Sequence, residues 1–212
     1  MAIVQNPVTG RSKKKMGNVV FSTQFGKNTM RSKPVTVRNP RTTAQTQQRG
    51  KMKFAMSVLR TFTAVFRLGF AKAAVGMSAF NYGFRDGLAA AVSGISPNFT
   101  FTPANLMVAR GNGLSLPSGN FTESGPECKT QFDVILKNSF DKNDDKAILA
   151  IYNTELNEVA FSSAAVRSDA TAVVTTPTNW ATGNHVSGYL FFVSADGTRI
   201  SDSQYVGAIV LA

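Results

Sequence analysis

Residues 147–152 read Ala-Ile-Leu-Ala-Ile-Tyr, and residues 189–193 read Tyr-Leu-Phe-Phe-Val. Both stretches are apolar at consecutive positions, so both faces of the strand that each one predicts must be buried. A β-sandwich buries only one face of such a strand, and another layer must cover the outer face. Two sources for this layer stay open, the helical part of the same chain and an adjacent subunit.

The two stretches belong to a β-rich C-terminal part, residues 104–212. Seven strands are expected there, separated by turn-forming clusters. Seven strands in about 105 residues fit an immunoglobulin-like or fibronectin-like β-sandwich. This fold predicts Trp180 and Tyr189 in the core, with Tyr189 making the corner hydrogen bond of such sandwiches. The predicted strands are 105–110, 129–137, 146–152, 158–163, 170–175, 186–194 and 203–211.

Residues 41–95 are expected to form a helical hairpin, which makes the whole chain an α+β protein. Thr42 or Thr43 is a candidate cap for its start. Two series of apolar residues then recur at spacings of three or four, the period of a helix with one apolar face. The first series is Phe54, Val58, Phe62, Val65 and Gly69, and the second is Phe80, Phe84, Leu88 and Val92. The residues expected to break the helices are Gly69, Gly76, Gly94 and Pro97.

Residues 1–40 are expected to form a basic, extended arm. Residues 19–25 alternate loosely between apolar and polar, and the following Gly26-Lys27-Asn28 has the turn chemistry of a β-hairpin. Pro34 and Pro40 keep the chain after the hairpin extended. The segment has little core of its own, so it is either a floppy tail or an arm that becomes ordered against a neighbour.

The charge of the chain is divided unevenly. The 212 residues carry a net charge of +11, with a pI of about 10.1. Residues 1–85 hold 16 lysines and arginines and no acidic residue, whereas residues 86–212 hold 7 basic and 12 acidic residues. The two parts are therefore +16 and −5, and the first acidic residue is Asp86. A basic half of this kind predicts an acidic partner, either nucleic acid or a negatively charged protein surface.

Four basic residues of the first predicted helix are spaced four, seven and seven apart, so they share one face. No acidic residue lies among them to form i,i+4 pairs. This basic stripe is either a solvated face or the surface that binds an anionic partner. The stripe is Arg49, Lys53, Arg60 and Arg67. The candidate residues for partner or nucleic-acid binding are Lys13, Lys14, Lys15, Arg31, Arg38, Arg41, Arg49, Lys53, Arg60 and Arg67.

The residues offer no motif for catalysis or for a cofactor. One cysteine and one histidine cannot complete a zinc site of Cys/His type. His185 is expected to be structural or solvated, and Cys128 is expected to be a small buried residue without an activating neighbour. Asp141, Asp144 and Asp145 lack the pattern of a calcium loop and are expected to form a hairpin turn. We therefore expect no enzyme activity, no cofactor and no metal.

No membrane contact or export is expected either. The longest run without charges, residues 87–109, contains two prolines and two asparagines and is too polar for a membrane span. The first residues lack the apolar core of a signal peptide, so the chain is expected to stay where it is made.

Residues 17–49 carry a resemblance to a known family. Gly17-Asn-Val-Val20, Met30-Arg-Ser-Lys-Pro34, and residues 39–45, Asn-Pro-Arg-Thr-Thr-Ala-Gln, resemble uncharacterised proteins common in Bacteroidota and their tailed phages. The order and spacing of this likeness extend over nearly the whole chain, to Tyr205-Val-Gly207. Residues 11–15 depart from the family's Gly-rich opening. The resemblance implies no catalytic residues.

The phage members of that family, crAss-like phages included, imply a virion component. The most specific expectation is a non-enzymatic ring or connector subunit of the head-to-tail region, in the neck or tail. Such a subunit would form a homo-oligomeric ring and contact other virion proteins through its basic arm and its sandwich. The alternative is a sequence-independent nucleic-acid-binding protein whose basic N-terminal half contacts phosphates.

Overall fold

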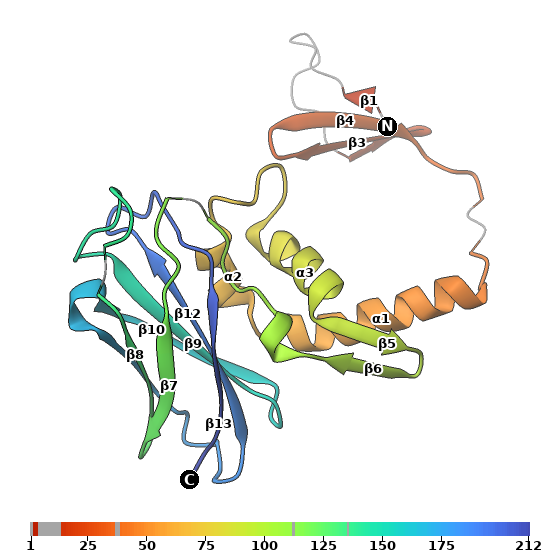
Figure 1. Ribbon diagram of the computed structural model, residues 1–212. Coiled ribbons are helices and arrows are strands. Elements are labelled where there is room, and N and C mark those ends of the chain that lie inside the picture. The colour runs from red at the N-terminus through yellow and green to blue at the C-terminus, as the bar shows by residue number, and fades with distance from the viewer. Residues whose placement is uncertain (1, 4–13, 37–38, 112, 135) are drawn as a thin grey trace. The chain divides into compact units, whose positions relative to one another are not determined.

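The computed structural model contains two compact units, Met1–Gln45 and Thr46–Ala212 (Figure 1). Antiparallel sheets and helices both occur, so the protein belongs to the α+β class that the sequence predicts. The structure describes all residues except 1, 4–13, 37–38, 112 and 135.

The first unit contains a four-stranded antiparallel sheet in the order β1-β4-β3-β2. The expected hairpin is present as β3 and β4, and its turn is Phe25-Gly26, one residue earlier than the predicted turn. Both turn residues have positive φ, 49° and 78°, as the tight two-residue turns of β-hairpins require. The strands are β1 (Ala2–Ile3), β2 (Lys14–Met16), β3 (Val19–Gln24) and β4 (Lys27–Ser32).

Three helices follow, where the sequence predicts two. They are α1 (Thr43–Leu59), α2 (Thr63–Gly69) and α3 (Ala79–Ala90). The expected first helix is interrupted at residues 60–62, where the Thr61 hydroxyl donates to the Val58 carbonyl at 2.7 Å and N–H groups bond three residues back. This tighter bonding ends α1. Within the described part of the chain, every helix is too short or too polar to traverse a bilayer.

The second predicted helix ends before Val92, contrary to the prediction. Val92 starts β5 (Val92–Ile95), which pairs with β6 (Asn98–Phe101) in a hairpin. Phe99 of this hairpin stacks on Phe54 of α1, with the ring centroids 5.9 Å apart. Val92 is buried in the core beneath the helices. A spacing of four therefore placed Val92 in the correct core but in the wrong element.

Residues 119–210 form a β-sandwich (Figure 1), with one sheet in the order β10-β9-β12-β13 and the other in the order β11-β8-β7. The fourth strand of the sandwich, β10, pairs with the third strand, β9. In a constant-type immunoglobulin domain the fourth strand lies in the other sheet, so this arrangement is the fibronectin-like one. The strands are β7 (Gly119–Ser124), β8 (Glu127–Phe132), β9 (Lys146–Asn153), β10 (Glu158–Val166), β11 (Thr171–Thr175), β12 (His185–Val193) and β13 (Gln204–Val210).

One predicted strand of the C-terminal part is absent, and one strand of the sandwich was not predicted. Residues 105–110 contain no strand, because their N–H groups bond to other segments. The N–H of Val108 donates to the Ser203 hydroxyl at 2.9 Å, and that of Arg110 to the Gly69 carbonyl at 3.1 Å. The missed strand is β7, whose sequence Gly-Asn-Phe-Thr-Glu-Ser has one apolar residue and no alternating pattern.

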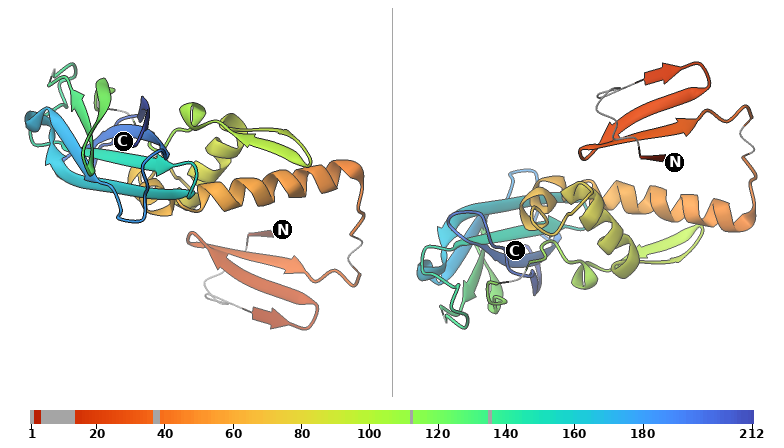
Figure 2. Two further views of the ribbon diagram at one scale, coloured as in Figure 1. Left: turned by 90° about the horizontal axis from the view of Figure 1, so that it is seen from below. Right: turned by 90° about the horizontal axis from the view of Figure 1, so that it is seen from above.

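Alternate residues of β9 and β12 face two different cores. Those facing the sandwich interior pack against the β11-β8-β7 sheet. Those facing outward pack against the aromatic residues of α2 and its flanks. The inward residues are Leu149, Ile151, Leu190 and Phe192, and the outward ones are Ile148, Ala150, Tyr152, Tyr189 and Phe191. The helices of the same chain therefore cover the outer face of the doubly apolar strands, while α1 extends away from the sandwich (Figure 2).

Trp180 lies in the sandwich core, as predicted, and its Nε1 donates to Glu158 Oε2 at 2.9 Å. Tyr189 is also buried, but on the helical side of the sheet. Its hydroxyl donates to the Pro103 carbonyl at 2.9 Å. The corner hydrogen bond predicted for Tyr189 is wrong, since its partner lies in the segment that precedes the sandwich.

Candidate partner-binding site

The ten residues predicted to bind a partner are divided between the two units. Lys13 and Arg38 lie outside the described residues. The other eight are all exposed to solvent. Those of the first unit are Lys14, Lys15, Arg31 and Arg41, and those of the second unit are Arg49, Lys53, Arg60 and Arg67.

In the first unit the strand register places two of these cations together and separates a third. Lys15 pairs with Val20, and Val20 pairs with Arg31. Residues that lie directly opposite each other in an antiparallel sheet share a face, so Lys15 and Arg31 lie on the same face. Lys14 pairs with Phe21 and therefore lies on the other face. The predicted run of adjacent lysines is thus split by the alternation of the strand.

The face that holds Phe21 carries a group of apolar side chains, with Lys14 on the edge strand β2. Met16 pairs with Val19, and Met30 pairs with Phe21, so these side chains join it. Met16 is 73% exposed. None of the described side chains of the first unit is buried. The arm sheet, strands β1 to β4, is therefore amphipathic and has no buried core of its own among the described residues.

In the second unit the basic stripe crosses from α1 to α2 and borders a groove. Arg60 and Arg67 lie on this groove, and Met56 and Thr63 stand between the stripe positions, at spacings of three and four. The opposite wall is the start of α3, where the Ser78 hydroxyl accepts a hydrogen bond from the N–H of Asn81 at 3.1 Å. The α1–α3 groove has a volume of about 440 Å³ and is lined by Met56, Arg60, Thr63, Arg67, Ser78, Ala79 and Phe80.

The groove is positively charged and lacks an internal counter-charge. No described carboxylate forms an ion pair within 4.0 Å with Lys53, Arg60 or Arg67. Asp86, the first acidic residue of the chain, pairs instead with Arg110 at 3.5 Å. The N-terminus of α3 adds the partial positive charge of the helix dipole. The arrangement suits a carboxylate or phosphate placed beside an apolar group.

The sequence predicted Arg60 and Arg67 as partner-binding residues, and it predicted neither a groove beside them nor the apolar residues and the α3 wall that line it. We call Met56 and Phe80, the large apolar residues of its lining, the floor of the groove; they come from different helices. Met56 is 41% exposed, and it stands between Lys53 and Arg60 in the stripe. The position of a methionine within the predicted basic stripe was the sequence signal that could have indicated an apolar surface beside the arginines. The approach of Phe80 depends on how the helices pack, which residue spacing does not encode.

Cys128 and His185, the two residues considered for nucleophilic or base chemistry, lie in different surroundings. Burial raises the pKa of the Cys128 thiol to about 11, and the nearby charge of Glu123 adds to this effect. A thiol with this pKa is protonated at neutral pH and is a poor nucleophile. His185 is exposed, and its Nδ1 lies 2.7 Å from Glu155 Oε1. Cys128 is therefore buried, as predicted, and His185 belongs to a surface pair.

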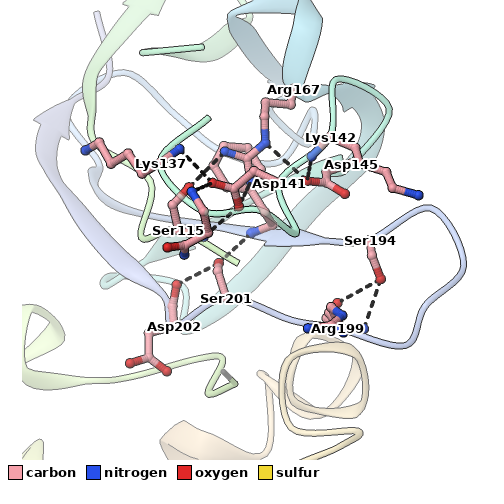
Figure 3. A network of polar contacts seen from close by, with 12 residues as sticks. Ser115, Lys137, Asp141, Lys142, Asp145, Arg167, Ser194, Arg199, Ser201 and Asp202 are labelled. Atoms are coloured by element: carbon pink, nitrogen blue, oxygen red, sulfur yellow. Dashed lines mark hydrogen bonds and ion pairs between the residues drawn. The ribbon is translucent and has the colours of Figure 1, made fainter. Parts of the chain in front are cut away.

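The acidic residues of the loop before β9 differ from their prediction. This loop joins two different sheets, so the hairpin expected for Asp141, Asp144 and Asp145 is wrong. Asp141 and Asp145 are buried with Arg167, whose Nη2 lies 3.3 Å from Asp141 Oδ1 and whose Nε lies 3.2 Å from Asp145 Oδ2 (Figure 3). Arg167 Nη1 also donates to the Ser115 hydroxyl at 3.0 Å.

This buried cluster holds the loops at one end of the sandwich. Asp141 accepts hydrogen bonds from the N–H groups of Ser115, Lys137 and Asn138, each at 2.9 Å (Figure 3). The guanidinium of Arg167 lies 3.9 Å above the ring of Phe192. The contacts of the two carboxylates are therefore structural. Among the described residues, no group of three or more His, Cys, Asp or Glu side chains is placed to hold a metal ion.

The fold defines the class: an α+β protein in which helices cover one sheet of a fibronectin-like sandwich. The chain belongs to the Family of unknown function (DUF6266), whose family model matches residues 10–207. This match includes strands of both units. The comparison with curated proteins gives no match.

Proposed function

We propose that this chain is a non-enzymatic structural subunit of a tailed-phage virion, a ring or connector protein of the neck or tail. The observation that carries the proposal is the arm sheet. None of its described side chains is buried, and a single sheet needs another layer against its apolar face to be stable. A neighbouring subunit or another virion protein supplies that layer in the assembled particle.

The two faces of the arm sheet suit such an assembly. The apolar face, with Met16 and Phe21, packs against a neighbour, and the face with Lys15 and Arg31 meets an acidic surface. The −5 charge of residues 86–212 provides such a surface on other copies of the chain. Repeated contacts of this kind between unlike surfaces form a ring when the rotation from one subunit to the next closes.

The virion as the site of assembly is supported by the sequence resemblance of residues 17–49 to proteins of tailed phages. Under this proposal the protein is made in the host cytoplasm and then incorporated into the particle. The proposal includes no reaction and no cofactor.

Fractionation of phage particles tests this function. The protein should co-purify with intact virions through a density gradient. The Phe21→Asp variant, which places a charge on the apolar face of the arm sheet, should be made at normal levels but missing from particles. Phe21→Leu, which keeps this face apolar, is the matched control at the same position and should be incorporated. Absence of the wild-type protein from purified virions rejects the proposal.

The second candidate function is sequence-independent binding of nucleic acid. It is favoured by the exposed cations of the stripe, since Lys53, Arg60 and Arg67 have no described carboxylate partner. Together with the arm residues they would contact phosphates. This function predicts that the logarithm of the binding constant for duplex DNA falls by about 0.9 per contacted phosphate for each tenfold rise in salt. A gel shift that does not depend on salt, or no shift, rejects it.

A further inference from the structure

We propose that the α1–α3 groove binds the β9–β10 turn of a second copy of this chain. The turn comprises residues 154–157, and Glu158, the first residue of β10, is included in this surface. The inference rests on the proposed role as an assembling subunit, and it names the two surfaces that join one subunit to the next.

The composition of the groove selects a protein partner over nucleic acid. Arg60 and Arg67 on its rim require an anion, and both phosphate and carboxylate meet that need. The floor formed by Met56 and Phe80 is apolar, and a phosphate backbone brings no apolar group to cover it. A peptide segment with a carboxylate next to an aliphatic side chain meets both requirements. The volume of the groove, about 440 Å³, lies in the usual range of binding pockets.

Charge excludes the arm as the occupant. Residues 1–85 contain no aspartate or glutamate, so an arm placed in this groove would set lysines and arginines against Arg60 and Arg67. Like charges placed together at an interface oppose binding. The occupant from a second copy must therefore come from residues 86–212.

The β9–β10 turn has the required combination of residues. Leu156 is 43% exposed at its tip, and it stands between the exposed residues Glu155 and Glu158. Residues 153–166 contain no lysine or arginine, and the basic side chain that contacts Glu155 is His185, whose Nδ1 lies 2.7 Å from Glu155 Oε1. The turn thus presents a leucine flanked by negative charges, which complements an apolar floor flanked by arginines.

Hydrogen bonds already hold both carboxylates in place. Glu155 accepts from the N–H of His185 at 2.9 Å, and Glu158 accepts from Asn179 Nδ2 at 2.8 Å and from Trp180 Nε1 at 2.9 Å. Carboxylates that are held before binding lose less conformational freedom when the complex forms.

The turn lies beside the groove of its own chain, outside it. Asn157 Nδ2 donates to the Ser57 carbonyl on α1 at 2.9 Å. Ser57 follows Met56 and is therefore about 100° around the helix from it. The turn is fixed against one face of α1 while the groove opens on another, so the groove of one copy is available to the turn of the next. Contacts of this type repeat head to tail.

A charge-exchange experiment on the full chain tests this contact. One variant reverses the groove, Arg60→Glu with Arg67→Glu, and the other reverses the turn, Glu155→Lys with Glu158→Lys. Each variant alone should associate at least about a hundredfold more weakly than the wild type, since a close interfacial ion pair contributes about tenfold or more. An equimolar mixture of the two should associate again, as complexes in which the variants alternate. Sedimentation velocity gives the masses.

The Lys137→Glu and Lys142→Glu double variant is the matched control. It makes the same change in charge as the groove-reversed variant, at two exposed positions of the sandwich, and should associate like the wild type. The melting temperature of each variant shows whether the monomer is folded. Recovery of association in the mixture would show that both reversed variants are folded.

Three results would overturn the inference. One is a wild-type chain that stays monomeric at high micromolar concentration. Another is groove-reversed protein that associates as well as the wild type. The last is a mixture that fails to associate although both variants melt like the wild type. Loss of duplex DNA binding without loss of self-association would assign the groove to nucleic acid. Presence of the protein in virions would still support the proposed function in each of these cases.

Discussion

The Arg167 cluster shows how one residue organises the sandwich. Its guanidinium contacts two buried carboxylates, which come from the loop before β9. Removing the cation leaves both carboxylates without their counter-charge in a site that water does not reach. An uncompensated buried charge costs several kcal/mol.

Arg167→Ala should therefore lower the free energy of unfolding by about 3–5 kcal/mol. The control is Lys129→Ala, which removes a partly exposed pair 3.2 Å from Glu127 and should cost less than about 1 kcal/mol. Urea unfolding monitored by the fluorescence of Trp180 measures both. A cost below about 1 kcal/mol for Arg167→Ala would contradict the structural role of the cluster.

Protonation of the Asp141 carboxylate is expected to lower the stability of the protein in acid. Burial alone raises the pKa of its carboxyl, but the hydrogen bonds from Ser115 and Asn138 and the charge of Arg167 outweigh burial and leave the pKa below the ordinary value of 3.8. The carboxylate therefore contributes stability above that value, and the contribution is lost as the pH falls through the pKa of the folded state.

Unfolding free energies measured between pH 5 and pH 2 should fall steeply below about pH 4 in the wild type. Asp141→Asn should be less stable at pH 5 and should lose less stability over the same range. A variant whose free energy falls in parallel with that of the wild type would show that another group governs the acid response.

Among the elements, β9 and β12 could be predicted from sequence because their apolar residues stand at consecutive positions. The same pattern predicted a covering layer, and the structure selects the helices of the same chain. The strand β7 was missed because it has a single apolar residue. The strands of the β5–β6 hairpin were missed because each has only four residues and the helical spacing before them runs on to Val92. The basic rim of the groove followed from the spacing of Arg60 and Arg67, whereas its far wall depends on the packing of α3.

The packing of α3 against α2 depends on close approach at Gly83. A Cβ added at this position would lie 2.8 Å from ring atoms of Phe66 and Phe70. Both rings are fully buried, so they have little space to move. Gly83→Ala should destabilise the second unit by about 1–3 kcal/mol through overpacking, despite the better helix propensity of alanine.

Chemical denaturation of Gly83→Ala and of the control Ala89→Ser, an exposed position on α3, measures this effect. The control should stay within about 0.5 kcal/mol of the wild type. A Gly83→Ala protein as stable as the wild type would mean that the two helices are farther apart than the structure has them.

In the whole molecule, the boundary between the basic and the acidic part of the sequence does not coincide with the boundary between the two structural units. The charge changes sign at Asp86, whereas the two units meet at Gln45 and Thr46. The basic helices belong to the same unit as the acidic sandwich, and they are joined to it by the core of Phe62, Phe66 and Phe70. Apolar packing therefore decides the units, and the excess charge remains on the surface for partners.

The division of the chain into two units predicts where limited proteolysis should cut first. Trypsin should cut first at Arg41, which is exposed between the arm sheet and α1 and is followed by Thr42. The product should be a stable fragment that begins near residue 42 and retains the sandwich. Mass spectrometry of a digestion series identifies the fragment, and early cleavage at Lys146 or Arg167 would contradict the division into units.

The count of this protein in purified phage particles tests the central claim most directly. A ring or connector subunit should be present at a fixed, small number of copies per virion, in a constant ratio to the other structural proteins across gradient fractions. Quantitative mass spectrometry of intact particles gives this number. A ratio that varies between fractions, or particles without the protein, would contradict the account.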